Sequence, residues 1–329
     1  MHAEPSGLNP GRAVRRPALL VSLAAALGWI TVVAAEPAAA PAAAAAPAAA
    51  PTAASATAGR SASAAGTAFV GYLQQQALPV ARNARLRGAP VKLLSEDRGS
   101  GRLALYALLP AGFHERLRTR EARWNNESFE VFVVAGEVGF GAERLGRYDF
   151  AYSPAGVARP PLSSEHGGEA LVFFDPATAD AEARAKLAAI GPYVTRYSTE
   201  RWNPGTVSQA AGVNIDLRIQ HLKKDPLTGA RTWLVRLAPG VAVPWERHSV
   251  VEEGFLLEGR YSLPECLPQG IRHGEYTAGG YFYRPGGIPH SGPGSGPLEP
   301  SVWLQRSPAQ LDVRFFGDCR DGTGTQPVQ

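Results

Sequence analysis

Short apolar runs, cut by Gly, Pro and Asp, dominate the chain from residue 67 onward. The clearest are 102–109 (RLALYALL), 129–138 (FEVFVVAGEV), 169–175 (EALVFFD), 231–238 (RTWLVRLA), 253–261 (EGFLLEGRY) and 312–317 (DVRFFG). Many short strands at turn-punctuated intervals predict an all-β sandwich or barrel. The best helical signal covers 178–190 and ends at Gly191-Pro192, which is a stop signal.

Three segments of this pattern occur twice, in the same order. LYALLPAG (105–112) resembles LVRLAPG (234–240), EVFVVAG (130–136) resembles EGFLLEG (253–259), and FAYSPAGVAR (150–159) resembles YFYRPGGIPH (281–290). A repeat with a period near ~130 residues predicts two similar domains in tandem. We place them at 67–177 and 211–320, with a helical or irregular connection at 178–210 and a flexible tail at 321–329.

The first 66 residues differ in character from the rest. Arg12, Arg15 and Arg16 precede an apolar run that ends in small residues near residue 35. This arrangement predicts a secretory signal peptide over 1–35, and hence a periplasmic or secreted protein. An uncleaved N-terminal anchor is the alternative, because the run is almost long enough to span a bilayer. Residues 36–66 are rich in Ala and Pro and predict a disordered linker.

Charge and cysteine content narrow the function only slightly. The chain has 33 Lys and Arg against 29 Asp and Glu, and part of this excess lies in the signal segment. No basic run with interleaved aromatic residues occurs, so a nucleic-acid partner is not indicated. Cys266 and Cys319 are the only cysteines. In an exported chain they form either a disulfide or two free buried thiols, and the sequence leaves both open.

Candidate metal ligands gather in the second half. Glu246 and His248 are two residues apart and would share a strand face. Glu252 follows His248 by four residues. His290 comes three residues after the end of a Pro-Gly-Gly turn. Histidine and carboxylate ligands in this mixture suit Fe, Mn, Ni or Zn, so we expect a divalent metal as cofactor.

These residues carry a resemblance to the cupin superfamily. Its first motif (Gly, five residues, His-x-His, three or four residues, Glu, six residues, Gly) resembles the spacing of Gly240, Glu246, His248, Glu252 and Gly259. Its second motif (Gly, five residues, Pro-x-Gly, two residues, His) matches the spacing of Gly279, Pro285, Gly287 and His290. The second half is most similar to bacterial ChrR-like cupin domains. The resemblance implies two jelly-roll barrels, each a double-stranded β-helix, with the site inside the mouth of the second.

The chain departs from the family pattern in both halves. Glu246 replaces the first histidine, and it is either a metal ligand or a solvated glutamate. Glu253 competes with Glu252 for the ligand role or acts as general base. In the first half Arg159 stands where His290 stands in the second. Arginine stays protonated and cannot ligate a metal, so we expect no metal there. Arg159 is then an exposed loop residue or binds a carboxylate.

The reaction does not follow from the fold. We expect a small-molecule ligand or substrate, with Trp245, Tyr281 and Tyr283 as pocket candidates, although such residues are more often barrel core. An enzyme would be metal-dependent and dioxygenase- or isomerase-like. The alternatives are a non-catalytic metal or ligand sensor, and a structural bicupin with a vestigial site. No membrane span is expected beyond the signal segment. A homodimer is an alternative to a monomer, because barrel edges can pair.

Overall fold

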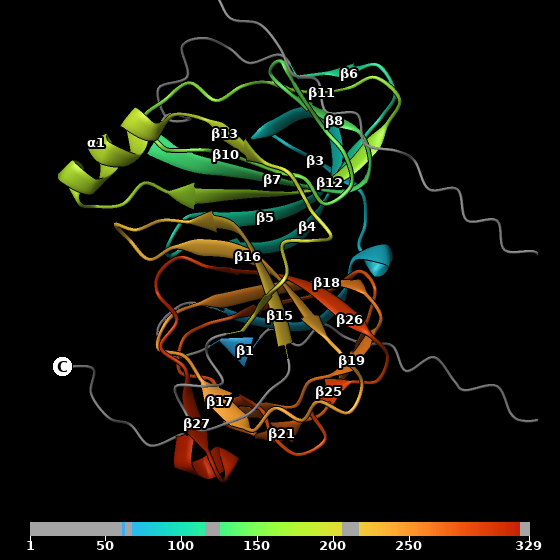
Figure 1. The fold of residues 1–329 in the computed structure, drawn as a ribbon, viewed down its shortest axis with the longest axis vertical. Helices are drawn as coiled ribbons and strands as arrows, with labels where there is room; N and C mark the ends of the chain where they lie inside the picture. The colour runs from blue at the N-terminus through green and yellow to red at the C-terminus, as the bar shows by residue number, and fades with distance from the viewer. Residues whose placement is uncertain (1–60, 63–67, 116–125, 206–216, 323–329) are drawn as a thin grey trace, which may run out of the picture. The chain divides into compact units, whose positions relative to one another are not determined.

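The computed structural model describes residues 61–62, 68–115, 126–205 and 217–322. The predicted signal peptide lies outside these residues, as does the predicted linker except for Ser61–Ala62. Within the described part the regular secondary structure is almost entirely antiparallel β-strands in two successive barrels, which confirms the predicted fold class (Figure 1). No helix in this part is long and apolar enough to cross a membrane.

The N-terminal barrel is built from two sheets. The larger sheet runs, in spatial order, β13 (Tyr193–Thr195), β10 (Phe150–Ser153), β7 (Glu127–Gly136), β12 (Gly168–Pro176), β5 (Arg102–Leu109), β4 (Leu86–Asp97) and β3 (Ala81–Asn83). The smaller sheet is ordered β6 (Phe113–His114), β11 (Leu162–Ser164), β8 (Val138–Phe140) and β9 (Glu143–Leu145).

The C-terminal barrel uses three sheets. The largest is ordered β1 (Ser61–Ala62), β2 (Ala68–Gln74), β23 (Gly280–Arg284), β18 (Glu252–Glu258), β26 (Ser301–Ser307), β16 (Arg231–Leu237), β15 (Leu217–Lys224) and β14 (Asn203–Pro204). The second is ordered β21 (Gly270–Arg272), β20 (Glu265–Leu267), β24 (His290–Ser291), β17 (Trp245–Arg247) and β27 (Arg314–Phe316). The third is ordered β22 (Glu275–Thr277), β19 (Arg260–Ser262) and β25 (Gly296–Pro297).

The two large sheets share one internal order, which confirms the repeat. The order β10-β7-β12-β5-β4 in the first barrel corresponds to β23-β18-β26-β16-β15 in the second. Two strands that flank these matching sets of five come from other parts of the chain. β2 precedes the first barrel in sequence yet pairs with β23 of the second, and β13 follows the first barrel and pairs with its β10.

One helix, α1 (Ala181–Ile190), lies between the barrels in sequence, as predicted. The Asp180 side chain caps its start by accepting hydrogen bonds from the backbone N–H groups of Glu182 and Ala183. Gly191, with φ of 71°, ends it, and Pro192 prevents its continuation. Among the described residues, 3₁₀ turns cover Gln75–Ala77 and Cys319–Gly322.

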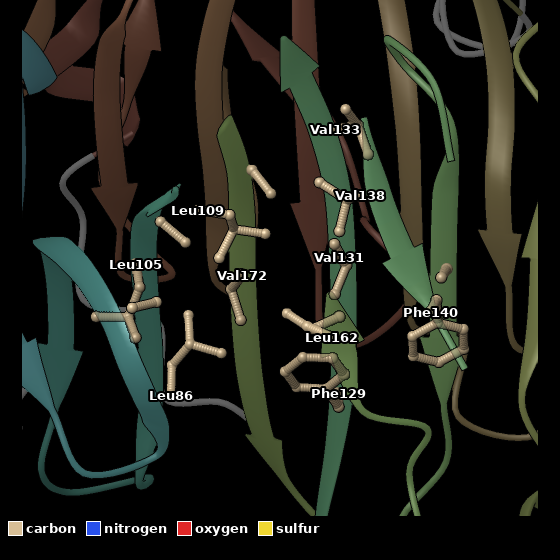
Figure 2. Packing of buried hydrophobic residues seen from close by; sticks show 14 of the residues in the cluster. Leu86, Leu105, Leu109, Phe129, Val131, Val133, Val138, Phe140, Leu162 and Val172 are labelled. Atoms are coloured by element: carbon tan, nitrogen blue, oxygen red, sulfur yellow. The ribbon is translucent and has the colours of Figure 1, made fainter. Parts of the chain in front are cut away.

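Strand alternation divides the apolar residues among three layers. The interior of the first barrel contains Leu105, Phe129 and Val172, whose side chains gather between its sheets (Figure 2). The interior of the second contains Trp233, Phe282 and Trp303, with others. A third cluster packs the opposite faces of the two large sheets together, and it includes Tyr106, Phe132, Phe150, Phe173, Phe255, Tyr281, Tyr283 and Leu304. Because both faces of these strands are buried, their sequences read as nearly continuous apolar runs.

Candidate metal centre

Three potential metal ligands converge inside the C-terminal barrel. Glu246 lies on β17, His248 directly after it, and His290 on β24, which pairs with β17 so that Glu246 stands opposite His290. One ligand atom from each of the three lies within 4.8 Å of the others. Ligand atoms about 2.1 Å from a shared ion are at most about 4.2 Å apart, so shifts of a few tenths of an ångström would seat an ion.

His290 is oriented by a backbone carbonyl. Its Nδ1 lies 3.1 Å from the oxygen of Ile288, which assigns the proton to Nδ1 as the donor. The Nε2 atom then carries a lone pair in the neutral ring, and it lies 3.5 Å from Oε1 of Glu246 and 3.5 Å from Oε2 of Glu252. A carbonyl that fixes the tautomer in this way is the usual support of a metal-binding histidine.

His248 is buried beside His290, with their ring centroids 5.0 Å apart. Its Nε2 lies 3.6 Å from Oε2 of Glu252, whereas its Nδ1 is buried with no hydrogen-bond partner in the described part of the chain. Burial lowers the pKa of His248, because desolvation disfavours the imidazolium. The ring is therefore neutral at pH 7, which is the form that binds a metal.

Glu246 faces the two histidines, and 18% of its side chain is exposed. Burial raises the pKa of this carboxyl, but the neighbouring His290 and His248 and the hydrogen bond from Ser291 outweigh it and lower the pKa to about 2. Ser291 donates a hydrogen bond of 3.1 Å to Oε1 of Glu246. Ser291 adopts φ of 69°, a conformation that is uncommon outside glycine and concentrates at functional sites.

A buried arginine holds two further carboxylates next to these ligands. Arg284, at the end of β23, donates through Nη1 to Oε2 of Glu252. Its Nε and Nη2 donate to the two oxygens of Glu265 at 3.0 and 2.6 Å. Glu252, Glu265 and Arg284 are all buried. Glu252 is therefore within reach of both histidines while its charge is already paired with a guanidinium.

The ligands face a cavity of about 120 Å³. Its wall is mainly apolar, with a few polar groups among aromatic and aliphatic side chains. The lining residues include Trp233, Val235, Leu237, Val243, Tyr261, Leu263, Phe282, Trp303, Leu311, Val313 and Phe315, together with the polar His221, Arg231, Arg284, Ser291 and Gln305. An apolar chamber with a few convergent polar groups is typical of a small-molecule site.

Four residues expected at the site lie elsewhere. Glu253 is next to Glu252 on β18 and therefore points to the opposite face, where it accepts hydrogen bonds from Tyr281 and Arg306. Tyr283 lies on that same face, between the barrels, and donates to Asp97 at 2.9 Å.

The fourth residue, Trp245, packs against the disulfide between Cys266 and Cys319. A Cβ at Gly292 would lie 2.2 Å from the Trp245 ring. The ring therefore packs closely against the backbone that directly follows β24, the strand of His290. The structure thus decides between the two cysteine alternatives in favour of the disulfide.

The corresponding position in the N-terminal barrel contains an ion pair. Arg159 donates through Nη1 and Nη2 to the two oxygens of Glu115, at 2.8 and 2.5 Å, and its guanidinium lies 4.2 Å from the centre of the Phe129 ring. Both side chains are almost fully buried. Arg159 is therefore not an exposed loop residue, and the carboxylate that it binds belongs to the chain itself.

Arg284, Glu265 and Arg231 are the site residues that the sequence did not reveal. Strand alternation gave a partial indication for Arg284. It lies two residues after Phe282 on the same strand, so the two side chains point to the same side. The sequence suggests Tyr281 and Tyr283 as pocket candidates, but the side of a strand that faces the barrel interior does not follow from its alternation alone.

Comparison with known proteins supports the cupin resemblance. A family model described as the ChrR cupin-like domain matches residues 193–297. The E. coli protein Ylba aligns over 79% of this chain and 97% of its own, with 13% identity and a TM-score of 0.55. A Nostoc punctiforme protein provisionally described as a dioxygenase aligns over 74% and 86%, with 15% identity and a TM-score of 0.50. No curated protein matches the chain.

Proposed function

Because the chain has the two-barrel fold of its cupin structural neighbours and residues 193–297 match the ChrR cupin-like domain, we propose that its second half is a metal-dependent small-molecule site. In this proposal Glu246, His248 and His290 hold a divalent ion at the wall of the cavity, and the ion and the apolar lining together bind an organic ligand. The N-terminal barrel has a structural role, because the Arg159–Glu115 pair fills the corresponding position.

The charge balance around the three ligands carries this proposal. Glu246, Glu252 and Glu265 bring three carboxylates to this part of the interior, and Arg284 is the one arginine that contacts them within ion-pair distance in the described residues. In the form that binds a metal both histidines are neutral, so two negative charges remain for an ion to balance. Buried charge without a partner is costly, and a divalent cation among these groups would balance it.

A bound ion would act as a Lewis acid toward an oxygen atom of the ligand. The chain itself would supply the remaining functions. Ile288 and Ser291 orient His290 and Glu246, Arg284 holds Glu252 beside the histidines, and the apolar wall excludes water. The mixed histidine and carboxylate donors suit Fe, Mn, Ni or Zn.

Metal titration followed by thermal unfolding tests the proposal. Mn²⁺, Fe²⁺, Ni²⁺ or Zn²⁺ should raise the Tm of the wild type, since an ion that binds only the folded state stabilises it. His248→Ala should abolish the shift, whereas His273→Ala, which removes an exposed histidine, should retain it. Equal shifts in the wild type and His248→Ala would refute metal binding at this centre.

A non-catalytic binding protein is the second candidate, and one observation favours it. Glu252 is already paired with Arg284, and Glu246 is assigned to the ion, so the described cavity presents no free carboxylate as general base. Oxygen consumption or turnover of added small molecules by the metal-loaded protein separates the two candidates. Ligand-dependent stabilisation without turnover would support the binding protein.

We also propose that the protein is exported. The predicted signal peptide over 1–35 supports this, and so does the disulfide, because disulfides persist in oxidising compartments. N-terminal sequencing of protein recovered from the periplasm or medium should begin near residue 36. An intact N-terminus in a membrane fraction would favour the uncleaved anchor.

A further inference from the structure

The geometry of the cavity points to a ligand that is a small organic acid with one carboxylate and a hydrocarbon body, and it assigns Arg231 as the residue that binds the carboxylate. The inference rests on the proposed function, because it takes the cavity beside the metal centre as the ligand site. It adds the class of ligand and the residue that selects it.

Arg231 begins β16, and alternation along this strand aims it into the cavity. Arg231, Trp233, Val235 and Leu237 all line the chamber, whereas Arg236 lies on the opposite face and is exposed. The guanidinium carbon of Arg231 lies 4.8 Å from the centre of the Trp233 ring, so a cation–π contact helps to hold the side chain at the cavity.

Arg231 forms no ion pair with any carboxylate in the described residues, and its Nε is buried without a hydrogen-bond partner. The other arginine of the cavity, Arg284, is fully occupied by Glu252 and Glu265. A guanidinium offers five donors in a planar fork that matches a carboxylate. Of the two arginines at the cavity, Arg231 is therefore the one available to a ligand.

The charges that line the cavity indicate how many acid groups the ligand carries. A divalent ion would balance the two negative charges left around Glu246, Glu252, Glu265 and Arg284. The charge of Arg231 then remains, and one ligand carboxylate would compensate it. Arg231 lines the same small cavity as Glu246, His248 and His290, so one small molecule in that cavity can contact both.

The wall and the size of the cavity define the rest of the ligand. The lining of the cavity that holds Arg231 and the metal centre is dominated by groups such as Trp233, Phe282 and Trp303, which suit a hydrocarbon body. A chamber of about 120 Å³ is well below the roughly 300–1,000 Å³ of sites for drug-sized ligands. Butyrate and benzoate are suitable probes, and butyramide and benzamide are neutral controls of nearly equal shape.

Calorimetric titration of these probes into purified protein, with and without Mn²⁺, tests the inference. We expect at least one acid to bind the wild type and its amide to bind at least about tenfold more weakly, which corresponds to about 1.4 kcal/mol. Arg231→Gln should weaken acid binding by at least about tenfold. Arg236→Gln, an arginine on the other face of the same strand, should change it by less than about twofold.

Three results would overturn the inference: neither acid binds, the amides bind as well as the acids, or Arg231→Gln binds the acids like the wild type. Failure of the proposed function has a different signature. In that case the wild type would take up no Mn²⁺. The titrations without metal would then test the role of Arg231, through the comparison of wild type, Arg231→Gln and Arg236→Gln.

Discussion

Arg284 is the residue on which the electrostatics of the candidate metal centre depend most. Its guanidinium is 2% exposed and contacts Glu252 and Glu265, which are also buried. Burial lowers the pKa of Arg284, but the charges of Glu265 and Glu252 outweigh it and hold the pKa above its ordinary value. Removing this one side chain would leave two carboxylates in the interior without a counter-charge.

Arg284→Met should therefore lower the free energy of unfolding by about 3–5 kcal/mol, as is typical when one partner of a buried ion pair is lost. Arg260→Met is the control, because Arg260 forms an exposed pair with Glu275 and exposed ion pairs contribute little to stability. Urea unfolding of the two variants measures the difference. Equal destabilisation would contradict the assigned role of Arg284.

At the scale of residues, the sequence predicts the candidate ligands better than it predicts their neighbours. Glu246, His248 and His290 were predicted from motif spacing, and the structure brings them together. Glu253 and Tyr281 were placed in the site, although they face the other barrel. Motif spacing constrains the ligands themselves, whereas the face taken by an adjacent residue depends on strand register, which tertiary packing decides.

Among the structural elements, β20 and the 3₁₀ turn Cys319–Gly322 are joined by the disulfide of Cys266 and Cys319. β20 also carries Glu265, which pairs in register with His290 on β24. The covalent link therefore connects the C-terminal end of the described chain to the strand that supports the candidate ligands.

Replacing both cysteines by serine should lower the free energy of unfolding by about 4 kcal/mol, because the bond closes a loop of 53 residues. The comparison uses chemical denaturation of oxidised wild type, reduced wild type and the double variant. Reduced wild type should resemble the variant. Stability of the double variant equal to that of oxidised wild type would show that the bond contributes nothing.

The sequence predicts the individual strands well but their partners only in part. β5 has the predicted bounds and α1 falls within the predicted helical region, because local periodicity and stop signals define them. The pairing of β2 with β23 joins segments about 200 residues apart in the chain. Such a contact leaves no local pattern, so the sequence alone could not predict it.

For the whole molecule, a buried ionic network connects the two barrels. Glu130 of the first barrel accepts hydrogen bonds from Lys223 at 2.5 Å and Arg306 at 2.9 Å, both from the second. Arg306 also donates to Glu253 and to Asp175 of the first barrel. The interface therefore combines this buried charged network with the packing of aromatic and aliphatic side chains.

Acid pH should weaken this interface through Glu130. Burial raises the pKa of Glu130, but the charges of Arg306 and Lys223 outweigh it and hold the pKa well below its usual 4.5. Below about pH 4.5 the unfolded chain binds a proton that the folded chain does not. Stability from this group is therefore full above that pH and falls by up to about 1.4 kcal/mol per pH unit as the pH decreases further.

Unfolding free energies of wild type and Glu130→Gln between pH 3 and pH 6 measure the effect. The wild type should lose more stability across this range than the variant, whose amide does not titrate. Parallel curves would show that Glu130 is not the group responsible. His114→Ala, which removes an exposed side chain in the first barrel, serves as a control for general effects of substitution.

The most direct test of the central claim is the metal content of the purified protein, measured by mass spectrometry without a histidine tag. The account predicts close to one equivalent of iron, manganese, nickel or zinc in the wild type, and its loss in His290→Ala. Absence of metal from both proteins, even after reconstitution with each ion, would contradict it. The cupin fold would then remain, with a C-terminal barrel that does not use a metal.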